Sequence, residues 1–132
     1  MLYVEDEESD ALFMQRAFTS AGLESVLRIV GDGRTAIAYL SGSGVYGDRD
    51  SYPVPAVVLL DLNLPGVHGF QVLKWIRSHP DYTGIPVLIF SGTTHASDKA
   101  KALELGANEF VQKPTSGMKF PELVRSLKEK WL

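Results

Sequence analysis

The acidic residue Asp61 follows four consecutive apolar residues, 57–60, and Pro65-Gly66 comes shortly after it. An apolar run of this kind between turn signals is typical of a short strand buried on both faces, as in the centre of a parallel sheet. In open α/β sheets, ligands bind beyond the carboxyl ends of the strands. We therefore expect Asp61 where chemistry takes place, although an aspartate there can also simply open a turn through an Asx-type hydrogen bond.

Four other polar side chains also come at the ends of expected strands, and they are Glu5, Asp6, Ser91 and Lys113. The carboxyl ends of parallel strands meet at one edge of a sheet, so these groups are expected beside Asp61. Three carboxylates gathered there repel one another unless a cation lies among them. Oxygen ligands without cysteine or histidine favour a hard ion, and Mg²⁺ fits a site that keeps several waters. The three carboxylates contribute −3 and Lys113 +1, so a divalent ion brings the formal charge to zero.

This set of groups supports phosphoryl transfer. A magnesium ion can bridge to a phosphoryl oxygen and leave Asp61 as the nucleophile that forms an acyl phosphate. The Ser91 hydroxyl and the Lys113 ammonium are then the remaining donors to the phosphoryl oxygens. Such chemistry depends on positioning and charge neutralisation.

The elements that must position these groups alternate between strands and helices along the chain. Strands are predicted at 2–4, 26–30, 57–60, 86–90 and 109–112, and helices at 9–22, around 36–40, 67–79, 97–105 and 117–131. Each crossover between parallel strands is right-handed, which puts helices on both faces of one sheet. The pattern predicts a doubly wound α/β domain.

Two segments are less regular. Residues 41–55 are rich in serine and glycine and predict a long surface connection with room for one extra helical turn. The helix at 97–105 has a thin apolar face made of Ala100 and Leu103, so we expect it to be loosely held.

Composition indicates one ordinary globular domain, with 132 residues, 45% hydrophobic and 22% charged. A net charge of −3 gives no sign of a nucleic-acid or membrane surface. The absence of cysteine excludes disulfides, thiolate nucleophiles and cysteine-ligated metal centres. No apolar run approaches the ~20 residues that span a bilayer, and the N-terminus lacks a signal-peptide pattern, so a cytoplasmic location is expected.

The chain resembles the receiver domains of two-component response regulators over its whole length, so 1–132 is expected to be one receiver domain. The features that match, in chain order, are Glu5-Asp6, the Asp-x-x-Leu-Pro-x-x-x-Gly run from Asp61 to Gly69, Ser91-Gly92, Phe110 and Lys113-Pro114. Within the family, the long loop before Pro55, the Asp-Leu-Asn-Leu-Pro run and the lack of an output domain resemble the single-domain regulators partnered with phytochromes.

The resemblance implies a flavodoxin-like (βα)5 fold with a five-stranded parallel sheet in the order 2-1-3-4-5. It makes Asp61 the phosphoacceptor. It makes Glu5, Asp6 and Asp61 ligands of Mg²⁺, with Glu5 able to act through water, and adds the backbone carbonyl of Asn63 to the ligand set.

The resemblance also assigns Ser91 and Lys113 to binding the phosphoryl group and implies a cis peptide bond between Lys113 and Pro114. Phosphorylation would draw the Ser91 hydroxyl toward the phosphoryl group and let Phe110 turn inward. This switch would repack the surface of the segments 97–105, 109–112 and 117–131. Serine replaces the commoner threonine at 91, and phenylalanine replaces tyrosine at 110, which removes a hydroxyl from the switch.

The implied partner is a sensor histidine kinase, of the phytochrome type if the narrower resemblance holds, or a phosphorelay. The repacked surface would serve a homodimer or a docked protein. Such a domain is a phosphoacceptor that catalyses its own phosphorylation and slow autodephosphorylation rather than an enzyme with a separate substrate. A receiver excised from a larger regulator, or a phosphorylation-independent pseudo-receiver that serves as a docking module, are the alternatives.

Other classes fit the sequence less well. A haloacid dehalogenase-type hydrolase would need an aspartate where Asn63 stands, and a flavodoxin would need a hydroxyl- and glycine-rich loop where Glu5-Asp6 stands. The histidines have no metal-ligand spacing and are predicted to be surface polar residues: His68, His79 and His95.

Overall fold

The computed structural model describes residues 1–93 and 95–132, and its centre is a sheet of five parallel strands. The strands are β1 (Leu2–Val4), β2 (Arg28–Val30), β3 (Val58–Asp61), β4 (Val87–Ser91) and β5 (Glu109–Gln112). They are arranged in the order β2-β1-β3-β4-β5. The predicted doubly wound flavodoxin-like fold and its strand order are therefore confirmed.

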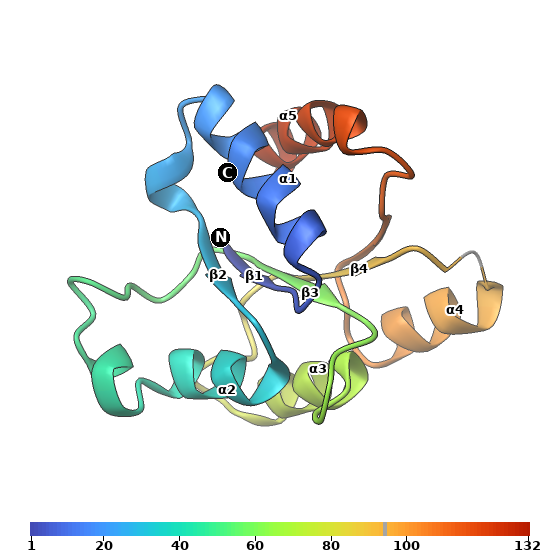
Figure 1. Cartoon of the computed structure of the whole chain (residues 1–132). Coiled ribbons are helices and arrows are strands. Elements are labelled where there is room, and N and C mark those ends of the chain that lie inside the picture. Colours follow the sequence, from blue (N-terminus) through green and yellow to red (C-terminus); the bar gives the residue numbers. More distant parts are fainter. Residues whose placement is uncertain (94) are drawn as a thin grey trace.

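Helices cover both faces of this sheet, with α1 and α5 on one side and α2, α3 and α4 on the other (Figure 1). The helices are α1 (Glu8–Ser20), α2 (Gly33–Ser41), α3 (Gly69–Ser78), α4 (Ala96–Glu104) and α5 (Phe120–Trp131). Short 3₁₀ helices are η1 (Glu24–Val26), η2 (Gly44–Gly47) and η3 (Gly117–Lys119). In the part of the chain that is described, no helix has the length and apolar character needed to cross a membrane.

The sheet separates two apolar clusters because successive side chains of a strand point to opposite faces. Tyr3, Leu59 and Phe90 pack under α1 and α5, whereas Val4 and Leu60 pack under α2, α3 and α4. Leu59 and Leu60 are both fully buried, as predicted for a strand covered on both faces.

The strand register determines which side chains meet at the carboxyl edge. Asp61 pairs with Phe90 across β3 and β4, and Ser91 pairs with Gln112 across β4 and β5. The backbone N–H of Lys113 donates to the Ser91 carbonyl at 2.8 Å, which extends the β4–β5 ladder by one residue. The chain thus leaves the sheet at the same level on neighbouring strands.

The connection between α2 and β3 is more compact than its composition suggests. It contains the expected extra turn, η2, and three tyrosine rings pack together, with centroids 5.0 to 6.0 Å apart: Tyr39, Tyr46 and Tyr52. The Arg49 guanidinium donates to the carbonyls of Tyr39 and Leu40 at the end of α2, at 2.9 and 2.8 Å, and to that of Tyr52 at 3.2 Å. These bonds hold the loop against the helix.

The prediction that Ala100 and Leu103 form the apolar face of α4 is wrong. Ala100 is exposed and Leu103 is 47% exposed, whereas Ala102 is the buried residue of this helix. Small apolar residues occur on more than one side of α4, so their spacing alone does not indicate which side faces the sheet. Packing of Ala102 against the core settles the choice.

Candidate functional site

Lys113 is the centre of the site at the carboxyl edge of the sheet. Its Nζ lies 2.9 Å from Glu5 Oε1, 3.1 Å from Asp10 Oδ2 and 3.3 Å from Asp61 Oδ2. Lys113 follows β5, Glu5 follows β1 and Asp61 ends β3, so three strands and the first turn of α1 meet there. The structure thus brings Glu5, Asp61 and Lys113 together as the sequence predicts.

Asp61 uses its two oxygens differently. Oδ1 accepts the backbone N–H of Asn63 at 3.2 Å, which is an Asx-type turn, and Oδ2 faces Lys113. The side chain opens a turn and still presents an oxygen to the site, so the two interpretations of this aspartate are compatible. Asp61 is only 5% exposed, which limits the water around it.

The loop after Asp61 returns closely to the strand end at Gly69, the first residue of α3. The Gly69 N–H donates to the Leu62 carbonyl at 3.1 Å. A Cβ at Gly69 would collide with the Asp61 carbonyl and approach the Leu62 Cα to 2.9 Å. The glycine that ends the Asp-x-x-Leu-Pro-x-x-x-Gly run is therefore required by this close approach.

Glu5 is almost completely enclosed, with 2% exposure. Its Oε1 accepts the Tyr3 hydroxyl at 2.6 Å as well as Lys113, and its Oε2 accepts the Glu7 N–H at 3.3 Å. Burial, followed by the contact with Asp61, raises the pKa of Glu5 above its usual range, although Tyr3 and Lys113 oppose this effect.

The neighbouring carboxylates shift the pKa of Lys113 in the opposite direction to burial. Burial alone would lower the pKa of Lys113, but the hydrogen bond to Glu5 and the charges of Asp61 and Glu5 outweigh it and raise the pKa. Lys113 is therefore held in its charged form.

The donor set fits a hard divalent cation. Glu5, Asp6 and Asp61 each offer a carboxylate oxygen, and these oxygens lie within 4.8 Å of one another. Asp6 is exposed and the other two are buried, so one side of the cluster is open to solvent. With Asp10 added, the site has four carboxylates and one ammonium, which contacts three of them, and the remaining negative charge favours a cation.

Ser91 and Phe110 lie on one face of the sheet. Ser91 is buried and its Oγ accepts the Thr93 N–H at 3.2 Å. Phe110 pairs with Ile89 on β4, two residues before Ser91. The ring is half-buried and lines a cavity of about 300 Å³ together with Ala96 and Lys99 of α4. There is space beside the ring, between α4 and β5, for a change of conformation.

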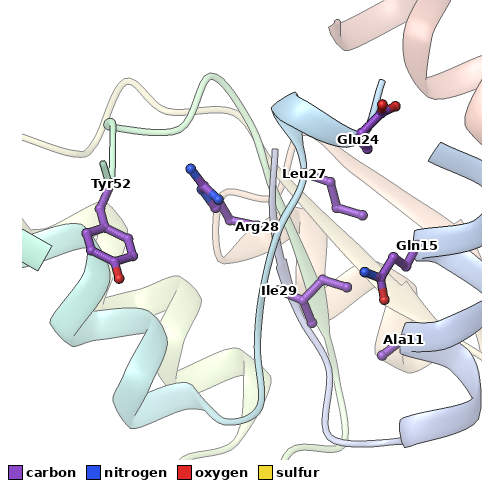
Figure 2. Close-up of a pocket in the computed structure, with 7 residues that line it drawn as sticks. All are labelled: Ala11, Gln15, Glu24, Leu27, Arg28, Ile29 and Tyr52. Atoms are coloured by element: carbon purple, nitrogen blue, oxygen red, sulfur yellow. The ribbon is translucent and has the colours of Figure 1, made fainter. Parts of the chain in front are cut away.

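A pocket of about 520 Å³ along the edge strand β2 is separate from this site (Figure 2). Gln15 of α1 and Tyr52 of the loop before β3 lie on opposite sides of β2, which contributes Arg28 and Ile29. None of the residues predicted for phosphoryl chemistry is among those that line it.

Comparison with known proteins identifies the architecture. The profile of the response regulator receiver domain family matches residues 1–125. The chain belongs to this family. Response regulator Rcp1 of Synechocystis sp. is 31% identical over 132 residues, which cover 100% of this chain and 88% of Rcp1.

Solved receiver structures agree with this assignment. The phosphorylated cyanobacterial phytochrome response regulator RcpA has a TM-score of 0.89 at 31% identity, covering 98% of this chain and 91% of that one. RPA3017, a response regulator in red light signaling of R. palustris, has a TM-score of 0.90 at 32% identity, covering 99% of this chain and 92% of that one. The predicted resemblance to phytochrome-associated regulators is therefore confirmed, as a similarity of sequence and of structure.

The receiver domain differs from one expectation in its backbone. The Lys113–Pro114 peptide bond is trans, so the expected cis bond is wrong. A prolyl bond prefers trans by only about 0.5–1 kcal/mol, so the surrounding structure decides the isomer. With the trans bond, Lys113 Nζ still reaches the three carboxylates.

Three residues contribute to this receiver in ways that the sequence pattern does not predict. Asp10 binds Lys113 from the first turn of α1, and Tyr3 binds Glu5 from within the core. The half-buried His68 caps α3, because its Nδ1 accepts the Phe70 N–H at 3.1 Å. Asp10 is an acidic residue in the first turn of α1, directly after the strand end that carries Glu5 and Asp6, and that position is the signal that could have identified it.

Proposed function

We propose that this receiver domain accepts a phosphoryl group on Asp61 from a sensor histidine kinase or a phosphorelay, in a Mg²⁺-dependent reaction. The observation that carries the proposal is the approach of Lys113 Nζ to 3.3 Å from Asp61 Oδ2, inside a cluster of carboxylates within 4.8 Å. A lysine and a cation on either side of a nucleophilic carboxylate are the groups that phosphoryl transfer requires.

In the reaction, Asp61 Oδ2 attacks the phosphorus of a phosphohistidine. The new P–O bond forms as the P–N bond breaks, and its electron pair stays on the imidazole nitrogen. The product is an acyl phosphate on Asp61. Attack of water on the phosphorus of the acyl phosphate returns the carboxylate and releases inorganic phosphate. Each cycle is therefore one self-catalysed phosphorylation followed by slow autodephosphorylation.

Glu5, Asp6, Asp61 and the backbone carbonyl of Asn63 would hold the Mg²⁺ ion, which neutralises negative charge on the phosphoryl oxygens. The solvent-facing Asp6 leaves room for the waters that Mg²⁺ retains. The relative Rcp1 has been solved in a Mn²⁺-bound form, with a TM-score of 0.84 at 30% identity, which supports the binding of a divalent cation by this chain.

Ser91 and Lys113 would bind the phosphoryl oxygens. Lys113 needs only to turn from Glu5 and Asp10, since it already contacts Asp61. Ser91 Oγ now accepts a hydrogen bond from the Thr93 N–H, and movement of Oγ toward the phosphoryl group would break this bond. The movement would also allow Phe110 to turn inward. The cavity beside Phe110 supports this switch.

The surface of α4, β5 and α5 would then carry the output, through homodimerisation or a docked protein. The similarity to RcpA and RPA3017 supports a kinase of the phytochrome type as the donor. We further propose that residues 1–132 act as one receiver domain in the cytoplasm, with no nucleic-acid or membrane partner, consistent with a net charge of −3.

Intact mass spectrometry after incubation with acetyl phosphate tests the proposal. The wild type should gain one phosphoryl group only when Mg²⁺ is present, and Asp61→Asn should gain none. Asp50→Asn, in an exposed loop, is the matched control and should behave as the wild type. No gain under any condition would contradict the proposal and favour a phosphorylation-independent docking module.

A further inference from the structure

Tyr3 carries a hydroxyl group into the core beside the acidic site. The residue is fully buried, at 0% exposure, and its ring packs edge-on against Phe90 with centroids 5.8 Å apart. Its hydroxyl donates to Glu5 Oε1 at 2.6 Å. Phenylalanine would fill almost the same volume without a buried hydroxyl, which is costly unless it is hydrogen-bonded. The packing of the ring therefore does not account for the hydroxyl.

The position of the hydroxyl follows from the strand. Tyr3 and Glu5 are two residues apart along β1 and its end, so their side chains point to the same face of the sheet. Glu5 Oε1 receives two side-chain donors, the neutral Tyr3 hydroxyl and the charged Lys113 at 2.9 Å. Of these two donors, Lys113 also binds other carboxylates of the site, those of Asp10 and Asp61.

The two donors differ in what the proposed reaction requires of them. Lys113 must turn to the phosphoryl oxygens on Asp61, and it then cannot hold Glu5 in the present geometry. Without Tyr3, Glu5 would keep only the 3.3 Å bond from the Glu7 N–H to Oε2. A carboxylate with 2% exposure cannot replace the lost donors with bulk water.

We propose that Tyr3 is a positioning residue for the metal site, whose hydroxyl keeps Glu5 oriented toward the cation, both before phosphorylation and when Lys113 turns to the phosphoryl group. The inference rests on the proposed function of this site. Tyr3 touches neither the cation nor the phosphoryl group and acts only through Glu5. It is the kind of outer partner that orients a metal ligand, and the loss of such a partner typically weakens metal binding by about 10–100-fold.

The test compares two tyrosines that each lose one buried hydroxyl. Tyr3→Phe removes the bond to Glu5, and Tyr39→Phe removes a 3.0 Å bond to the Pro53 carbonyl on the other side of the sheet. Tyr39 is also buried, so the two changes are closely matched. Mn²⁺ affinity is measured directly by isothermal titration calorimetry, and phosphorylation by acetyl phosphate is followed as a function of Mg²⁺ concentration.

We expect Tyr3→Phe to weaken Mn²⁺ binding about tenfold or more. The Mg²⁺ concentration that gives half-maximal phosphorylation should rise by a similar factor, while the rate at saturating Mg²⁺ stays close to that of the wild type. Tyr39→Phe should leave both quantities unchanged. A hydroxyl with a purely structural role would lower stability in both variants without moving the metal dependence.

Wild-type affinity in Tyr3→Phe, or a tighter site, would overturn the inference while leaving the proposed function intact. Failure of the wild type itself to bind metal or take a phosphoryl group would instead overturn the proposed function. If Tyr3→Phe does not fold, the Tyr3→Phe change is made in the Glu5→Gln variant. The double variant should bind Mn²⁺ with the same affinity as Glu5→Gln alone. A further loss of affinity would show that Tyr3 does not act through Glu5.

Discussion

Replacing Lys113 with methionine should destabilise the metal-free domain strongly. Methionine keeps most of the apolar stem and removes only the ammonium that contacts Glu5, Asp10 and Asp61. The Lys113 side chain is 16% exposed, and the side chains of Glu5 and Asp61 are 0% and 6% exposed. The carboxylates left behind would therefore be enclosed and without their counter-charge.

The size of the effect follows from this burial. Removing one partner of a buried ion pair costs about 3–5 kcal/mol. The contact with Asp10, whose side chain is 25% exposed, should add little, so we expect a loss of about 3 kcal/mol in the free energy of unfolding. For a domain of this size, such a loss lowers the midpoint of thermal unfolding by about 10 °C.

The stabilising effect of Lys113 depends on pH and on bound metal. The pKa of Lys113 is raised on folding, because its ion pairs outweigh burial, so its stabilising effect is fully present below the ordinary value of 10.5. The effect is lost only as the pH rises through the raised pKa. Mg²⁺ should restore part of the stability of Lys113→Met, and should stabilise it more than the wild type, because the variant site is more negative.

The assay is thermal unfolding at neutral pH, in a chelator and then in Mg²⁺. Lys130→Met is the matched control, since Lys130 forms an exposed pair with Glu109 at 3.4 Å and its side chain is 59% exposed. That change should cost at most about 1 kcal/mol. A loss in Lys113→Met no larger than in Lys130→Met, or no extra stabilisation by Mg²⁺, would refute the reasoning.

Three other predictions test the α3 cap, the α2 loop and the acidic site. His68→Ala should lose about 1 kcal/mol of stability, whereas His68→Asp should lose little, because only aspartate keeps an acceptor at the start of α3. Equal thermal stability of the two variants would contradict this. Arg49→Ala should cost about 2 kcal/mol in urea unfolding, because its guanidinium binds three backbone carbonyls, and an unchanged midpoint would argue against it. Mg²⁺ affinity should fall as the pH falls toward the raised pKa of Glu5, because the ion must displace a proton that folding favours. A calorimetric affinity that stays constant down to the ordinary value of 4.5 would be inconsistent with that shift.

Much of the site can be predicted from local sequence because strand ends in a parallel sheet converge. The apolar run before Asp61 indicates a strand buried on both faces, since such a strand requires apolar side chains at every position. Glu5 and Lys113 follow their strands in the same way, and the right-handed crossovers leave only one edge where all three can meet. Their convergence is visible in the order of residues alone.

Other features depend on contacts between segments far apart in the chain. The buried side of α4 is set by the packing of Ala102, since the helix has small apolar residues on several sides. The isomer of the Lys113–Pro114 bond depends on its surroundings, because the intrinsic preference is about 1 kcal/mol or less. Likewise, a serine- and glycine-rich connection becomes compact because Arg49 binds the carbonyls at the end of α2 and three tyrosine rings pack together.

Local sequence patterns were enough to predict the fold, the edge of the sheet that carries the candidate site and the oxygen-rich character of that site, because apolar runs and the residues that end them are local features. The side chains that surround Lys113 and Glu5 depend instead on how the elements pack. Asp10 reaches Lys113 across 103 positions of the chain, and the Tyr3 hydroxyl finds Glu5 in a core that excludes water. Such partners are selected by distance and burial in the folded chain, and neither quantity exists before the elements pack.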